Sequence, residues 1–196
     1  MDLYIFLTII ITSTIQSIFG VGVLLFGTPT LLLLGYPFLD SLSVLLPVSA
    51  SINLFQTIKD YKYINFSFYK KILFITVPFI IIFLYLISKI DINITLFIGS
   101  FLILISLKDN ITIIHHWLKN LLYFDKLFYV FMGIIHGVTN LGGALLSAKI
   151  FSSDLNKYQK RATIAISYMT FAIFQLITIS FLDNNFAYQN IIYIGI

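Results

Sequence analysis

Hydrophobic positions form long runs along the chain, and charged residues occur only between the runs. The windows without a charged residue cover 3–39, 41–58, 72–88, 92–107, 127–148, 162–182 and 184–196. A membrane-spanning helix needs about 20 apolar residues, with a range of ~17–25. Most of these windows therefore suit one span each, whereas the first is too long and the last is short. The pattern predicts an all-α fold, a polytopic membrane helix bundle.

The first window, 3–39, cannot be one straight span. As a single helix it would be roughly 55 Å long at about 1.5 Å per residue, while the hydrocarbon core of a bilayer is about 30 Å thick. The positions where it is expected to bend or break are Gly20, Gly22, Gly27, Pro29, Gly35 and Pro37. We expect a span near 3–19, a half-helix at 22–34 and a second span near 40–57.

A second interruption resembles the first. The stretches Ile15–Leu25 and Ile135–Leu145 each follow an apolar run and break it with glycine-centred polar residues. Paired interruptions in two halves of a membrane protein point to a transporter's substrate site. Freed backbone groups are tolerated only where protein or a water-filled cavity surrounds them. The alternative is that these glycines only let helices approach closely.

The second stretch lies 120 positions after the first, which predicts two internal repeats, each opening with a glycine-broken helix. The first repeat is expected at 1–108, with further spans near 70–88 and 92–107. An interfacial connector follows at 109–126, where polar and apolar residues intermix. The second repeat, 127–196, is expected to be incomplete at its C-terminus beside the first. This motivates a second hypothesis, a non-transporting membrane subunit or assembly factor, and it leaves a homo-oligomer or a partner subunit open.

Charges between the spans predict orientation, because cytoplasmic loops carry an excess of Lys and Arg. The 59–71 loop is basic and is expected inside the cell; it holds Lys59, Lys62, Lys70 and Lys71. Simple alternation of spans would place a second basic group outside, namely Lys149, Lys157, Lys160 and Arg161. These charges fall inside if 143–154 re-enters the membrane and turns back, or if 109–124 hides a further segment. The spans predict a multi-pass membrane protein, with the repeats either inverted or parallel.

The breaks offer chemistry for an anion. A helix that starts after a break has N–H groups without partners and a partial positive charge of roughly half a unit, which together attract anions. We expect two such N-termini to face each other, with neutral donors and a titratable histidine around them. The predicted substrate-binding residues are Gln16, Ser17, Gly20, Gly22, His136, Thr139, Asn140, Gly142 and Gly143. Lys149 and Arg161 are secondary candidates, and the alternative for Arg161 is a positive-inside anchor.

Composition excludes several other functions. The chain is 59% hydrophobic and 10% charged, whereas soluble domains carry about 25% charged residues. It has no cysteine, so a thiolate metal site or a thiol nucleophile is impossible. Every acidic residue lies at a predicted loop or span edge, and the adjacent His115 and His116 would point to different sides of a helix. We therefore expect no enzyme, no metal and no cofactor. The net charge of +4 accompanies a composition rich in Ile, Phe, Asn and Lys, and no nucleic-acid partner is expected.

At these residues the chain resembles the sulfite exporter TauE/SafE family of membrane transport proteins. The likeness is carried by Gln16–Gly22, Gly27–Pro29, Leu31–Gly35 and His136–Gly143. It implies transport of a small sulfur-containing anion, such as sulfite or an organosulfonate, across the cytoplasmic membrane. The chain departs from the pattern where Lys149 and Asn140 take the places of Pro29 and Gly20. Our leading hypothesis is an anion transporter in which the site between the two breaks opens alternately to each side of the bilayer.

Overall fold

Helices make up nearly all of the part of the chain that the structure describes. A computed structural model describes residues 2–90, 94–106 and 124–182. Its elements are α1 (Leu3–Phe19), α2 (Val23–Leu33), α3 (Phe38–Asp60), the 3-10 turn η1 (Tyr61–Tyr63), α4 (Phe66–Lys71), the π-helical turn η2 (Ile72–Thr76), α5 (Val77–Ser88), α6 (Ile94–Ser106), α8 (Asp125–Thr139), α9 (Gly142–Phe151) and α10 (Lys157–Leu182). No strand occurs within these residues, which confirms the all-α prediction. Most of the expected connector, with His115 and His116, and the end of the chain lie outside them.

Among the residues that the structure describes, three helical stretches are long and apolar enough to cross a membrane. They are Phe38–Tyr63, Phe66–Ser88 and Lys157–Leu182, and α1, α2 and α9 are shorter apolar helices. Large apolar side chains are strongly exposed on the outside of the bundle, for example Phe55, Phe74 and Phe181. Such a surface suits lipid, because contact between apolar side chains and water is unfavourable. These helices agree with a membrane protein.

One end of the bundle gathers basic residues. Asp125, at the start of α8, accepts ion pairs from Lys71 of α4 and Lys149 of α9, each at 2.7 Å. Arg161 of α10 lies 3.7 Å from Asp60 at the end of α3. We call this the basic end. Because α9 turns back after the second break, its Lys149 lies beside Lys71, and the second basic group does not fall on the opposite side.

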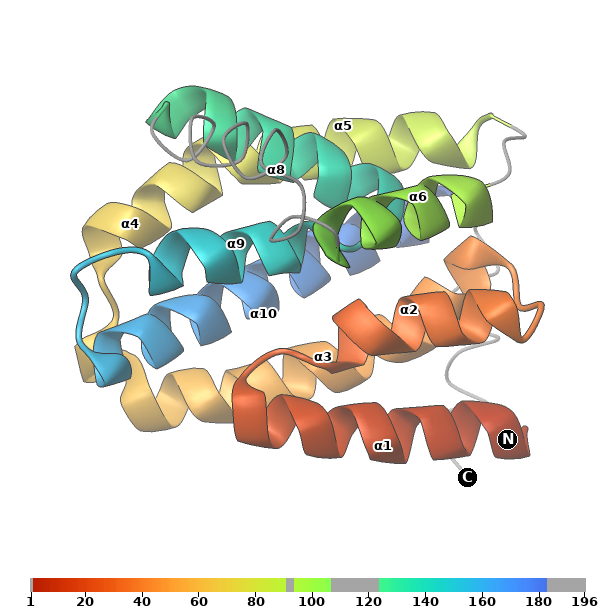
Figure 1. The fold of residues 1–196 in the computed structure, drawn as a ribbon, viewed down its shortest axis with the longest axis horizontal. Coiled ribbons are helices and arrows are strands. Elements are labelled where there is room, and N and C mark those ends of the chain that lie inside the picture. The colour runs from red at the N-terminus through yellow and green to blue at the C-terminus, as the bar shows by residue number, and fades with distance from the viewer. Residues whose placement is uncertain (1, 91–93, 107–123, 183–196) are drawn as a thin grey trace.

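The opposite end holds the N-terminus. The Tyr36 hydroxyl, in the loop after α2, donates a hydrogen bond to Asp2, which precedes α1. This bond lowers the pKa of the Asp2 carboxyl and raises the pKa of Tyr36 to about 12. α1 therefore starts at this end, whereas α8 starts at the basic end. The units α1–α2–α3 and α8–α9–α10 run in opposite directions through the bundle (Figure 1).

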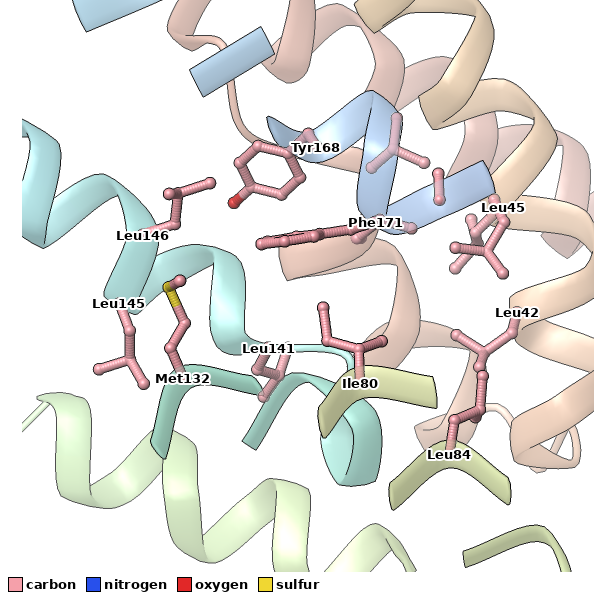
Figure 2. Close-up of a cluster of buried hydrophobic side chains, with 14 of the residues drawn as sticks. Leu42, Leu45, Ile80, Leu84, Met132, Leu141, Leu145, Leu146, Tyr168 and Phe171 are labelled. Carbon is pink, nitrogen blue, oxygen red and sulfur yellow. The ribbon is translucent and has the colours of Figure 1, made fainter. Parts of the chain in front are cut away.

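The core lies where helices from both units meet. α3 and α10 pack side by side over much of their length, and Figure 2 shows Leu42 and Leu45 of α3 facing the same cluster as Phe171 of α10. α8 approaches the α4–α5 stretch closely: a methyl group added at Gly133 would lie 2.6 Å from the Thr76 carbonyl oxygen. Small residues at such crossings let backbones pack closely inside a membrane. This packing fixes the end of α8, and with it the second break.

The shared carboxylate at the basic end gives a first prediction. Asp125→Asn should lower the free energy of unfolding by about 1 kcal/mol or more. The Lys71 and Asp125 side chains are about half exposed, and such pairs contribute modestly, whereas the Lys149 side chain is largely buried and loses its carboxylate partner. The loss should shrink as salt rises, because ions screen the charges. Denaturation of the purified protein at low and high salt measures both effects. Asp154→Asn, in the exposed loop before α10, is the control, and an equal or salt-independent loss in the two variants would contradict the prediction.

Candidate functional site

The first break joins the end of α1 to the start of α2. Gly20 adopts a left-handed conformation, with φ 79°, and its N–H donates to the Gln16 carbonyl at 2.8 Å, as at many helix C-termini. The backbone then turns so tightly that a methyl group added at Gly22 would lie 2.6 Å from the Gln16 backbone nitrogen. The Gln16 side chain accepts the Val23 N–H at 2.9 Å. The first amide of α2 is thus paired by α1 itself.

The second break, between α8 and α9, has the same construction. Asn140 is left-handed, with φ 61°, and its N–H donates to the His136 carbonyl at 2.8 Å. Asn tolerates this conformation better than most residues do. A methyl group added at Gly142 would lie 2.7 Å from the Met132 carbonyl oxygen and 2.5 Å from the His136 Cβ. Close packing on the preceding helix therefore fixes the start of α9 as it fixes the start of α2.

The contacts at the two breaks correspond position by position. The pairs are Thr12 and Met132, Gln16 and His136, Gly20 and Asn140, and Gly22 and Gly142. The corresponding side chains differ in what they bind. Whereas Gln16 pairs with the first amide of α2, His136 turns to α10, where its Nε2 lies 3.2 Å from the Gln175 Oε1. The His136 Nδ1 is buried without a hydrogen-bond partner.

A hydrogen bond links the second break to the first unit. The Asn140 Nδ2 donates to the Thr28 hydroxyl of α2 at 2.9 Å, and both side chains are buried. Since α2 begins at the first break and Asn140 belongs to the second, this bond joins the two breaks through α2. A site that used both half-helices would have this contact in its wall.

The residues expected from the sequence do not all lie together. The buried ones are Gln16, Gly22, His136, Thr139, Asn140, Gly142 and Gly143. Gly20 is half-buried, and Ser17 is exposed, with its hydroxyl donating to the Ser13 carbonyl at 2.9 Å. Lys149 and Arg161 lie at the basic end in ion pairs with Asp125 and Asp60. Their charges are thus matched by carboxylates at that end, and the buried group consists of neutral side chains and backbone.

Buried polar residues on α3 and α10 were missed in the sequence. They are Ser49, Asn53, Thr163, Ser167, Tyr168 and Gln175. The signal that would have found them is polar spacing within the long spans: Ser49 and Asn53 are four positions apart, as are Thr163 and Ser167, so each pair shares a helix face. Gln16 reaches this group through its Nε2, which donates to the Ser49 hydroxyl at 3.4 Å. Within the described ranges, no group of three or more His, Cys, Asp or Glu side chains is placed to hold a metal ion.

The comparisons with known proteins agree with this architecture. The family model described as "Sulfite exporter TauE/SafE" matches residues 5–196, nearly the whole chain. No curated protein and no solved structure matches the chain. The family consists of membrane transporters of sulfite and related anions, which fits the apolar outer surface and the neutral, buried breaks. The chain belongs to the sulfite exporter TauE/SafE family of membrane transport proteins.

Proposed function

We propose that the protein exports a small sulfur-containing oxyanion, of the sulfite or organosulfonate class, by alternating access at its two helix breaks. The observation that carries the proposal is the position-by-position correspondence of the contacts at Gly22 and Gly142. Two half-helices that begin inside the bundle each offer a partial positive charge. A small anion is the ligand that such ends favour.

The direction of the chain supports a pair of inverted repeats. The unit α1–α2–α3 and the unit α8–α9–α10 run oppositely and each contains one break. We assign them to a first repeat at 1–108 and a second at 127–196, joined by the connector at 109–126. In transporters built this way, one repeat rocks against the other around a site near the midplane. The excess of Lys and Arg assigns the basic end to the cytoplasm, where it also attracts anions.

Anion flux tests the proposal directly. The purified full-length chain is reconstituted into liposomes loaded with sulfite or methanesulfonate, and release is compared with that from protein-free liposomes. We expect protein-dependent release that saturates with anion concentration. A folded protein that neither binds nor releases any of these anions would refute the proposal and favour the accessory-subunit hypothesis.

The absence of cysteine in the chain allows alternating access to be tested separately. Ala144→Cys places one thiol in the first turn of α9. We expect a membrane-impermeant thiol reagent to label it from either side of the membrane, and the anion to slow labelling from both sides. Labelling from one side only, with or without anion, would contradict alternating access at this break.

The Asn140–Thr28 bond gives a second stability prediction. Asn140→Gly loses the hydrogen bond, worth about 0.5–1.5 kcal/mol, but keeps a residue suited to positive φ. Asn140→Ala loses the bond and adds strain of roughly 1–2 kcal/mol, so it should be the less stable variant. Thr28→Val removes the same bond from the other side but leaves the buried Asn140 Nδ2 without a partner, so it should cost about 1–3 kcal/mol. Chemical denaturation ranks the three, and equal losses for the Ala and Gly variants would contradict the role of the left-handed turn.

A further inference from the structure

The first turn of α9 is surrounded by buried polar atoms that have no hydrogen-bond partner. All of them belong to side chains that are at least nine-tenths buried. They are the His136 Nδ1, the Asn140 Oδ1, the Ser147 hydroxyl, the Tyr168 hydroxyl and the Gln175 Nε2. An unpaired buried polar group is costly, so such a concentration at one helix N-terminus requires an explanation.

Tyr168 of α10 lies directly against this helix end. A methyl group added at Gly143 would overlap the Tyr168 hydroxyl. Ser147 is one helical turn further along α9 and shares the face of Gly143. Figure 2 shows the Tyr168 ring with its hydroxyl directed toward α9, near Leu146. Neither hydroxyl lies in hydrogen-bond geometry with a partner. Tyr168 thus presents a donor at the N-terminus of α9.

His136 lies against the same helix end. Its Cβ would be 2.5 Å from a methyl group added at Gly142, and its ring lies 4.7 Å from the ring of Phe171. Because its Nε2 faces the Gln175 Oε1, an acceptor, Nε2 carries the hydrogen of the neutral imidazole. The Nδ1 is then an acceptor. The group therefore combines donors from Tyr168, Ser147 and Gln175 with acceptors on His136 and Asn140.

The group has no charged member. Lys149 is on α9, but it lies in the last turn and pairs with Asp125. Elements packed against α8 and α9 carry few other titratable side chains: Tyr85 on α5 and, near the start of α10 at the basic end, Lys157, Tyr158, Lys160 and Arg161. The cost of transferring an ion from water rises with the square of its charge in the Born description. Neutral donors and one helix end therefore compensate a single charge far better than two.

Resting on the proposed function, we infer that this group, the α9 subsite, binds a singly charged oxyanion that carries a donor hydrogen. For the sulfite class this is hydrogen sulfite, and the sulfite dianion and sulfate are excluded. Tyr168 and Gln175 donate to the oxygens of the anion, and the His136 Nδ1 accepts its hydrogen. Tyr168, Ser147 and Gln175 are thus substrate-binding residues in addition to those at the breaks.

The inference makes two requirements of the anion, a single negative charge and a donor hydrogen. Three anions whose charge is fixed near neutral pH test them separately. Sulfamate and methanesulfonate are singly charged and similar in shape, but only sulfamate has donor hydrogens. Sulfate carries two charges. We expect sulfamate to raise the unfolding temperature of the purified chain at the lowest concentration, methanesulfonate at about tenfold higher concentration, and sulfate not at all. Hydrogen sulfite, in a mildly acidic buffer, should behave like sulfamate.

Two variants test the assigned donors. Tyr168→Phe keeps the ring and should weaken sulfamate binding about tenfold or more, as expected for loss of a hydrogen bond to a charged ligand. Tyr129→Phe is the control, because Tyr129 is a buried tyrosine on α8 whose hydroxyl also lacks a partner. Gln175→Met should remove the preference for sulfamate over methanesulfonate, because His136 loses the contact that fixes its hydrogen on Nε2.

The outcomes separate this inference from the proposed function. Sulfate binding as tightly as methanesulfonate, or Tyr168→Phe behaving as Tyr129→Phe does, would overturn the α9 subsite while leaving anion transport intact. A folded wild-type protein without binding or flux of any anion would overturn both. The probe series uses the wild-type protein, so it decides the inference even if a variant fails to fold.

Discussion

Gly142→Ala is expected to destabilise the protein by about 1–3 kcal/mol or more, as overpacking does in a well-packed core, and to abolish anion flux. The added methyl group would lie 2.7 Å from the Met132 carbonyl oxygen and 2.5 Å from the His136 Cβ. Neither atom can move away by rotation of a flexible side chain. The start of α9 must shift instead, and His136 would move with it. Since stabilities of native proteins are typically only 5–15 kcal/mol, the loss is large.

The same substitution at Gly22 should have an equal effect, because its methyl group would meet the Gln16 nitrogen at 2.6 Å and the Thr12 carbonyl oxygen at 2.7 Å. Gly99→Ala in α6 is the matched control: nothing lies within 4 Å of the added methyl group, and loss of a helical glycine should stabilise by roughly 0.5–1 kcal/mol. Thermal unfolding in detergent and sulfite release from liposomes measure the two effects. If Gly142→Ala unfolded at the same temperature as Gly99→Ala, the close packing at the break would be refuted.

The class of fold was accessible from the sequence because it depends on length and charge. Uncharged windows long enough to span a bilayer predicted helices, and the helical structure and the family match confirm a membrane transport protein. The excess length of the first window, read against bilayer thickness, indicated an interruption near Gly20 and Gly22, and α1 ends at Phe19. These inferences required no knowledge of which side of each helix is buried.

The sequence does not predict which side chains of a span point into the core and which point to lipid, because lipid and protein core are both apolar. Ile80 is fully buried and Ile82 is half exposed, although the two residues are identical and two positions apart. Ser17 was expected in the site beside Gln16, yet the helix turns its hydroxyl outward. The hydrophobic pattern distinguishes core from solvent only when the solvent is water. Tyr168 and Gln175 were missed for the same reason, since the sequence does not show which residues a polar side chain within a span contacts.

The difference between the two breaks bears on how the proposed site works. In the first, Gln16 pairs with the Val23 amide, so the start of α2 is already satisfied by the protein. In the second, His136 bonds to α10 and leaves its Nδ1 unpaired beside the unpaired Tyr168 hydroxyl. A ligand gains more where polar groups are not paired within the protein. We therefore expect the first break to serve mainly as a fixed wall and the second to make most of the contacts with the anion.

Gln16→Leu is expected to destabilise the protein by about 1–3 kcal/mol, the cost of leaving a buried amide without a partner. The side chain is 1% exposed, and its Oε1 accepts the Val23 N–H at 2.9 Å, so water has no access to replace it. Leucine fills similar space but offers no acceptor. The start of α2 should loosen from α1, and anion flux should fall even where the variant remains folded, because α2 carries Thr28, the partner of Asn140.

Two further variants separate this effect from general damage to α1. Ser49→Ala removes the bond from the Gln16 Nε2, at 3.4 Å, and the bond from the Asn53 Nδ2, at 3.2 Å. Asn53 keeps its bond to the Ser49 carbonyl and the Val23 amide keeps its acceptor, so this variant should cost less than Gln16→Leu. Thr14→Val alters an exposed side chain on the same helix and should change stability by no more than about 0.5 kcal/mol. Denaturation of the three purified variants gives the order of their stabilities. If Gln16→Leu were as stable as Thr14→Val, the Gln16 side chain would not hold the start of α2, and the first break would depend on the packing at Gly22 alone.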